Sequence, residues 1–164
     1  MKRFNSILDR TSGMLRYLGA IALTLMMLLT VVDVIGRFFK HPIFGSVELV
    51  GFLAVIVAAA ALPHTYKIDG HVGVEIVTRM LPKRISLWVS LFTSTLSLCL
   101  FSVIAWQMFI YAEDIQAAGE VSMNLEFPIH YIVYILAAGL TVFSVTILQH
   151  LIDTVKKLRN TALK

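Results

Sequence analysis

Five histidines are the first candidates for chemistry in this sequence, because paired imidazoles can hold a haem iron: His41, His64, His71, His130 and His150. Two axial ligands would have to lie at the same depth on facing helices. His64 and His150 both fall near one end of an apolar segment, so a haem- or quinone-linked membrane anchor stays open as the alternative hypothesis. No histidine falls in the middle of an apolar segment, however, and no two are four residues apart.

Asp33 and Arg37 are the best candidates for an ion pair. They are four residues apart with the acid first, which is the favourable order on one helix face. An ionisable residue inside a membrane segment is by default a functional hypothesis. This pair lies in the last two turns of its segment, where arginine can extend to the headgroups. We therefore predict local pairing, or a contact between subunits, rather than an ion pathway.

Two further acids, Glu48 and Glu120, lie in or beside the connections between apolar segments. Together with Asp33 and Arg37 they are the candidate residues for subunit contact or docking. The third apolar segment carries several serines and threonines, whose hydroxyls usually bond within their own helix or across to a neighbour. The single cysteine, Cys99, cannot form an internal disulfide. Because phosphate-cradling loops, cysteine pairs and zinc signatures are missing from the sequence, we predict no enzyme activity, no cofactor and no metal site.

The elements that carry these residues are apolar and long. The chain has 164 residues, of which 58% are hydrophobic and 15% charged, whereas a soluble domain has about 25% charged residues. We expect one domain, residues 1–164, with four membrane-spanning helices at about 15–39, 47–66, 85–111 and 127–152. The third apolar stretch exceeds the thickness of the hydrocarbon core, so the long helices should tilt or protrude. The fold class is therefore an all-α integral membrane protein.

Basic residues alternate between the two sides of this arrangement. Of the 14 lysines and arginines, 12 fall in the two tails and the second connection, and two fall in the first connection. The third connection, residues 113–126, has four acids and no base. Because basic loops stay in the cytoplasm, both termini are predicted to be cytoplasmic. The net charge of +4 then reflects contact with anionic lipids, and no nucleic-acid partner is expected.

The second connection should lie flat in the inner headgroup layer. Residues 67–84 read as an amphipathic interfacial segment, with Arg79, Lys83 and Arg84 on lipid phosphates. The alternation of apolar residues in 72–76 is also compatible with an extended segment.

Local signals set the expected helix ends. We predict a turn at 42–45, Ser46 as the N-cap of the second helix, Pro63 at its inner end, and Pro128 in the first turn of the fourth helix. Small residues cluster in the second helix at Ala54 and residues 58–61. This small-residue face, and the hydroxyl-bearing third helix, are predicted contact surfaces for a partner.

Five short motifs, in this order and spacing, resemble the small membrane subunit of tripartite ATP-independent periplasmic (TRAP) transporters. They are DVIGRFF at 33–39, PIFGSVEL at 42–49, AALPHT at 60–65, GHVGVE at 70–75 and GEVS at 119–122. The similarity covers nearly the whole chain. Gly73 departs from the pattern, since the family often has a basic residue there.

The resemblance implies a bacterial inner-membrane subunit of a sodium-coupled importer of organic acids, such as sialic acid or C4-dicarboxylates. In that family a periplasmic substrate-binding protein captures the anion and a large multi-span subunit moves it across the membrane. The small subunit is expected to brace the large one and to help dock the binding protein.

Overall fold

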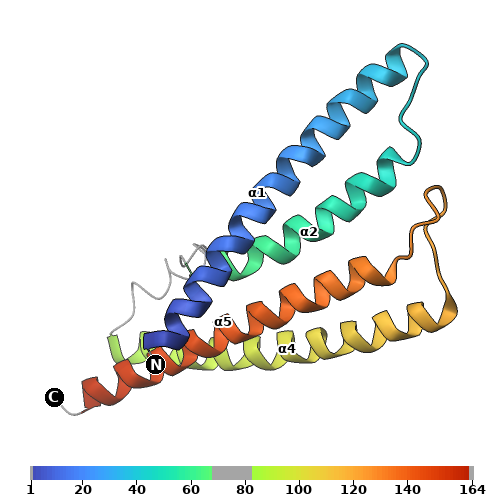
Figure 1. The fold of residues 1–164 in the computed structure, drawn as a ribbon. Helices are drawn as coiled ribbons and strands as arrows, with labels where there is room; N and C mark the ends of the chain where they lie inside the picture. The colour runs from blue at the N-terminus through green and yellow to red at the C-terminus, as the bar shows by residue number, and fades with distance from the viewer. Residues whose placement is uncertain (1, 68–82, 163–164) are drawn as a thin grey trace.

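The protein is a bundle of four long helices, seen here in a computed structural model that describes residues 2–67 and 83–162. In chain order they are α1 (Lys2–Phe38), α2 (Ser46–Lys67), α4 (Lys83–Ala118) and α5 (His130–Ala162) (Figure 1). The described residues contain no β-strand, and their single isolated β-bridge joins Val121 to Pro128. The predicted all-α fold class is confirmed.

Each helix contains a segment long and apolar enough to cross a membrane: Gly13–Phe38, Ser46–Tyr66, Ile85–Ala118 and His130–Lys156. The segment in α4 has 34 residues. At ~1.5 Å per residue it is roughly 50 Å long, against a hydrocarbon core of ~30 Å. Such a helix has to tilt or extend into the headgroups.

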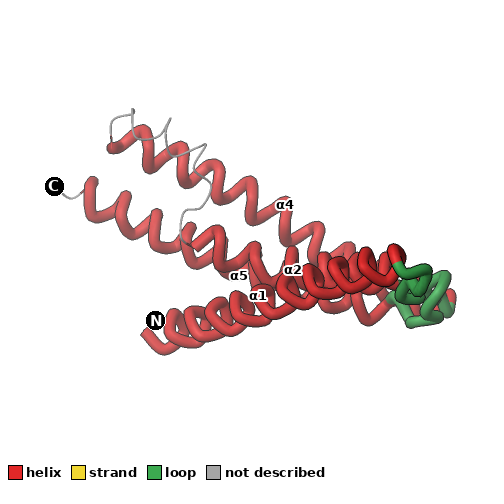
Figure 2. Tube along the Cα trace, turned by 90° about the horizontal axis from the view of Figure 1, so that it is seen from above, coloured by secondary structure: helices red, strands yellow, loops and turns green. Residues whose placement is uncertain are grey.

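The helices pack in the order α1, α2, α5, α4, so neighbours in space are not always neighbours in sequence. Figure 1 shows two pairs, α1 with α2 and α5 with α4, which splay apart toward the ends that carry the two short connections. Seen from above, α4 and α5 also separate toward the opposite end, where the chain termini lie (Figure 2). Below, the two ends are called the loop end and the terminal end.

The small residues of α2 are used within the chain. A Cβ atom added at Gly19 of α1 would lie 3.1 Å from Ala60 Cβ, and one added at Gly139 of α5 would lie 2.6 Å from Ala59 Cβ. Ala59 and Ala60 are buried. Adjacent alanines of α2 therefore face two different helices and let both backbones approach closely, as small residues do in membrane bundles.

This packing corrects part of the predicted partner surface. The most buried small residues of α2 serve contacts with α1 and α5, although Ala54, Ala58 and Ala61 remain exposed. The hydroxyls of α4 behave as expected, since those of Thr93 and Thr95 donate to the carbonyl oxygens four residues earlier in their own helix.

The interior of the bundle is centred on α5. In its most apolar window 44% of the residues are buried, compared with 6% in α4. The ring of Phe143 packs edge-on against Phe101 of α4 and Tyr66 of α2, with centroid distances of 4.7 and 5.6 Å. Nearby, the buried Ser94 hydroxyl lies 3.3 Å from His150 Nδ1 and 3.4 Å from the Tyr66 hydroxyl. One aromatic and polar cluster thus joins α2, α4 and α5.

Several helices begin or end away from the approximate membrane spans expected from the sequence, each for a local reason. Helix α4 continues past 111 to Ala118 because the first residue with a positive φ after it is Gly119. Helix α5 starts at His130 because Pro128 is held in the bridge to Val121. The buried Pro63 lies inside α2, which continues to Lys67.

The prediction of Ser46 as an N-cap is also wrong. The Leu49 amide donates to the Gly45 carbonyl oxygen, so Gly45 occupies the cap position and Ser46 is the first helical residue.

The predicted interfacial segment lies mostly outside the described residues. Lys67 is the last residue of α2, and Lys83 and Arg84 begin α4. Arg79 falls outside the described ranges. So do residues 72–76, for which the sequence is compatible with either a helix or an extended segment.

Candidate functional site

The connection between α1 and α2 is a tightly bonded turn. After Phe38 the chain reverses direction at Lys40, which has φ 62°. The His41 amide donates to the Gly36 carbonyl oxygen at 2.7 Å, and the Lys40 amide donates to the Arg37 carbonyl oxygen at 3.1 Å. These bonds satisfy the last carbonyls of α1, as in a Schellman cap. A Cβ atom at Gly36 would overlap the His41 carbonyl oxygen, so this turn requires glycine there.

Asp33 ties this turn to α1. Its Oδ2 accepts from Arg37 Nε at 2.7 Å, and its Oδ1 accepts from the Ile43 amide at 3.0 Å. Arg37 Nη2 lies 3.4 Å from Ser46 Oγ at the start of α2. The predicted ion pair is therefore present, and it fixes the angle at which the chain enters α2.

The connection between α4 and α5, residues 119–129, folds into its own small hairpin. Gly119 has φ 67°, and the following Glu120 amide donates to the Ile115 carbonyl oxygen at 3.2 Å. Ser122 and Phe127 then face each other: the Ser122 amide donates to the Phe127 carbonyl oxygen at 2.9 Å, and the Phe127 amide donates to Ser122 Oγ at 3.2 Å.

Glu48, in the first turn of α2, joins the hairpin to that helix. Its Oε1 accepts from the Asn124 amide at 2.9 Å and from Asn124 Nδ2 at 2.8 Å, and its Oε2 accepts from the Leu125 amide at 3.1 Å. One carboxylate thus satisfies three donors of the hairpin tip. Charged acceptors make the stronger hydrogen bonds in proteins, so these contacts hold the hairpin against α2.

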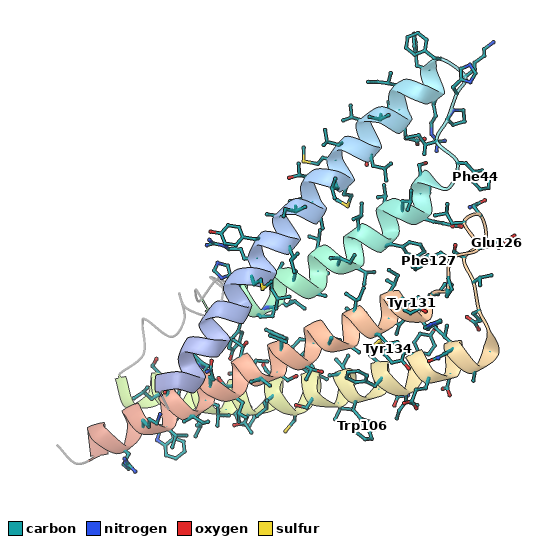
Figure 3. The ribbon with its side chains drawn as sticks, in the orientation of Figure 1. Phe44, Trp106, Glu126, Phe127, Tyr131 and Tyr134 are labelled. Carbon is teal, nitrogen blue, oxygen red and sulfur yellow. The ribbon has the colours of Figure 1, made fainter. Side chains whose placement is uncertain are left out.

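Apolar contacts complete the junction. The Leu125 side chain fills the space beside Gly45, where an added Cβ would come within 2.6 Å of Leu125 Cγ. The centroid of the Phe127 ring lies 5.5 Å from the ring centroid of Phe52 on α2 and 6.1 Å from the ring centroid of Tyr131 on α5. Figure 3 shows Phe127 and Tyr131 on the side of α5 that faces α2, where the two helix pairs splay apart.

We call residues 39–45 and 119–129 together the loop platform. Its surface combines exposed apolar side chains with exposed acids: Phe44, Met123, Glu120 and Glu126. Figure 3 shows Phe44 and Glu126 at the loop end of the molecule.

The four candidate residues divide into two groups. The side chains of Asp33, Arg37 and Glu48 are engaged in the intrachain contacts described above. Glu120 is exposed, and within the described residues its backbone, not its carboxylate, makes the hydrogen bonds, donating to Ile115 and accepting from Ile129 at 3.4 Å.

Sequence reasoning missed the partners of Glu48. A bond between residues 76 positions apart leaves no periodic signal in one sequence. From the sequence, Asn124 and Leu125 could have been singled out only as residues of a turn-forming stretch, without their partner.

The histidines of the haem hypothesis belong to different helix pairs. His64 lines a cavity between α1 and α2, and His150 belongs to the polar cluster with Ser94. Across the residues that the structure describes, no group of three or more His, Cys, Asp or Glu could hold a metal ion.

Comparison with protein families decides the class of protein. Residues 26–157 match the family described as tripartite ATP-independent periplasmic transporters, DctQ component. The chain belongs to this family. The match runs from the middle of α1 almost to the end of α5, and so includes the whole loop platform.

Membership of the DctQ family makes the chain a small membrane subunit of a TRAP transporter. It is a transporter component, not an enzyme, and its four apolar helices make it a multi-pass membrane protein. A search of curated proteins found no match.

Proposed function

We propose that this DctQ subunit braces a large transport subunit and presents the loop platform to a periplasmic substrate-binding protein, within a sodium-coupled importer of organic acids. The observation that carries the proposal is the Glu48 junction, which ties the hairpin to the first turn of α2, while Leu125 of the hairpin packs beside Gly45 of the first connection. A surface meant for repeated docking benefits from such preorganisation, because less freedom is lost on binding.

The spans themselves are poorly suited to carrying a substrate. No Asp, Glu, Lys or Arg occurs at 17–32, 49–66, 85–112 or 127–152. Transporters typically bind their substrate and coupling ion near the bilayer midplane, where helices are interrupted. Here the described helices run without interruption through their apolar segments. This supports a bracing role, with the substrate path on another subunit.

The outward faces of α4 and α1 supply the surface for lipid and for the large subunit. Along α4 the exposed side chains recur at intervals of three or four residues: Trp88, Phe92, Leu96, Leu100, Val103 and Trp106. Figure 3 shows Trp106 directed away from the rest of the bundle. A continuous row of bulky apolar side chains fits a helix that faces hydrocarbon or another membrane helix.

Charge favours a basic docking partner for the hairpin of the loop platform, whereas the exposed Lys40 lies in the other connection. Residues 113–126 contain four acids and no lysine or arginine. Glu120 and Glu126 are exposed there, whereas Glu48 is occupied within the chain. Electrostatic complementarity of this kind mainly raises the rate of encounter.

The first prediction tests the docking role through Glu120. In uptake assays with the complete three-part system, Glu120→Gln should lower the initial rate at low salt, and the defect should shrink as salt screens the attraction. The matched control is Asp153→Asn, which removes one exposed acid at the opposite end of α5. Equal rates for Glu120→Gln and the unmodified protein at low salt would remove Glu120 from the docking surface.

A further inference from the structure

A cavity of about 180 Å³ opens between α1 and α2 near the terminal end of the bundle. Its apolar wall is built by Gly19, Ala20 and Leu23 of α1 and by Val57 and Ala61 of α2. The contact between Gly19 and Ala60 brings the helix backbones together beside it. The lining residues recur over about two turns of each helix, at 16–23 and 57–65, so the space runs along the two helices as an apolar slot.

The polar residues of the cavity all lie on its terminal side. Arg16 precedes the apolar residues of α1, and His64 and Thr65 follow those of α2. Because the two helices are antiparallel, these three residues fall at the same end of the slot. The Thr65 hydroxyl already donates to the Ala61 carbonyl oxygen at 3.0 Å. Arg16 and His64 are therefore the groups able to donate to a ligand.

The exposed Arg16 side chain contacts its neighbour Tyr17. Its guanidinium carbon lies 5.0 Å from the centre of the Tyr17 ring, and Nη2 donates to the Tyr17 hydroxyl at 3.3 Å. Within the described part of the chain no carboxylate pairs with Arg16. Most of the five guanidinium donors remain available for an anion.

We propose that this cavity binds an anionic phospholipid from the leaflet on the terminal side. The phosphate lies against Arg16 and His64, and one acyl chain runs along the slot between Gly19 and Ala61. The charge of the mouth suits a phosphodiester, and its apolar wall suits a hydrocarbon chain. Basic pockets between membrane helices are established sites for anionic headgroups.

Native mass spectrometry of the whole 164-residue chain tests this site, with either phosphatidylglycerol or phosphatidylcholine added to the detergent. The unmodified chain should retain phosphatidylglycerol more strongly. Arg16→Gln should weaken that binding about tenfold, as expected for the loss of one charge-assisted hydrogen bond. Arg159→Gln, an exposed arginine at the same end on α5, should leave it unchanged.

A second pair of variants tests the acyl slot. Ala61→Leu should fill the cavity and weaken binding of both lipids, whereas Ala58→Leu, an exposed position outside the lining, should not. Three results would overturn the proposal: equal retention of the two lipids, equal losses for the Arg16 and Arg159 variants, or unchanged binding by Ala61→Leu. None of these readouts depends on transport, so the site stands or falls separately from the proposed function.

Discussion

At the scale of single residues, Glu48 and Asp33 play parallel parts at the loop end. Each carboxylate accepts bonds through both of its oxygens, and each receives at least one backbone amide from a connection. Asp33 orders the first connection, and Glu48 holds the second against α2. Because carboxylates can accept several hydrogen bonds at once, one residue can fix a loop that has little core of its own.

The second prediction concerns Glu48→Gln. Glutamine keeps one acceptor oxygen but turns a donor toward a backbone or side-chain amide of the hairpin tip, leaving a donor unpaired. We expect a loss of about 1–3 kcal/mol in the local stability of the hairpin. Hydrogen exchange should show the amides of Asn124 and Leu125 exchanging about 5- to 150-fold faster, the factor that this loss of stability corresponds to.

Glu126→Gln is the matched control for this experiment, since Glu126 is an exposed acid on the same hairpin. It should leave the exchange rates as they are. Unchanged exchange in Glu48→Gln would show that the carboxylate does not hold the hairpin.

The sequence alone predicts the Asp33–Arg37 pair but not the bonds of Glu48 to the hairpin. Asp33 and Arg37 share a helix, so their spacing predicts the pair. The partners of Glu48 and the Ile43 bond of Asp33 come from tertiary folding, which brings loops and helix ends together without a repeating pattern. Arg37 and Glu48 therefore shape the loop platform from within the chain, and their part in docking stays a prediction.

At the scale of elements, α2 is the helix that joins the two pairs. Ala60 meets α1 at Gly19, and Ala59 meets α5 at Gly139. A helix with small residues on two sides lets both neighbouring helices approach closely, and the close contact increases the dispersion attraction between them. The sequence showed that α2 was small-sided, but periodicity could not show that its partners were within the chain.

The third prediction compares two glycine substitutions. Gly139→Ala would place a methyl group 2.6 Å from Ala59 Cβ and 3.0 Å from the Ala59 carbonyl oxygen, so α2 and α5 must move apart. We expect a cost of about 1–3 kcal/mol in the free energy of unfolding, measured by denaturing titration in detergent.

Gly51→Ala is the control, because a Cβ there meets nothing within 4 Å. Alanine favours a helix more than glycine does, so this variant should unfold at the same denaturant concentration as the unmodified protein or at a slightly higher one. Equal destabilisation by both substitutions would argue against a tight contact at Gly139.

Helix ends were the least predictable feature of the elements. Four apolar segments follow directly from the lengths of uncharged sequence. Their ends depend on particular backbone conformations, such as φ 67° at Gly119 and φ 62° at Lys40. The Lys40 reversal could not be predicted, because lysine is not a residue that ordinarily adopts a positive φ.

At the scale of the whole molecule, the fold sets both short connections at one end and both termini at the other (Figure 1). The tails and the second connection hold 12 lysines and arginines, and the first connection holds two. This distribution predicts that the terminal end lies in the cytoplasm and the loop platform in the periplasm. This orientation is a prediction, and the docking proposal depends on it.

The fourth prediction tests the orientation by labelling with a membrane-impermeant thiol reagent in intact cells. In a Cys99→Ala background, Ala118→Cys at the loop end should be labelled, and Ala162→Cys at the terminal end should react only after the cells are permeabilised. Labelling of Ala162→Cys from outside would invert the assignment.

The central claim is that this DctQ subunit supports transport without carrying the substrate. The most direct measurement is uptake of the organic acid into liposomes with a sodium gradient across their membrane. The liposomes contain the chain alone, the large subunit with the binding protein, or all three. We expect that the chain alone gives no uptake above empty liposomes, and that adding it to the other two components is required for full uptake. Uptake of the same organic acid by liposomes that contain the chain alone would show that the chain carries the substrate itself, and would contradict the bracing role.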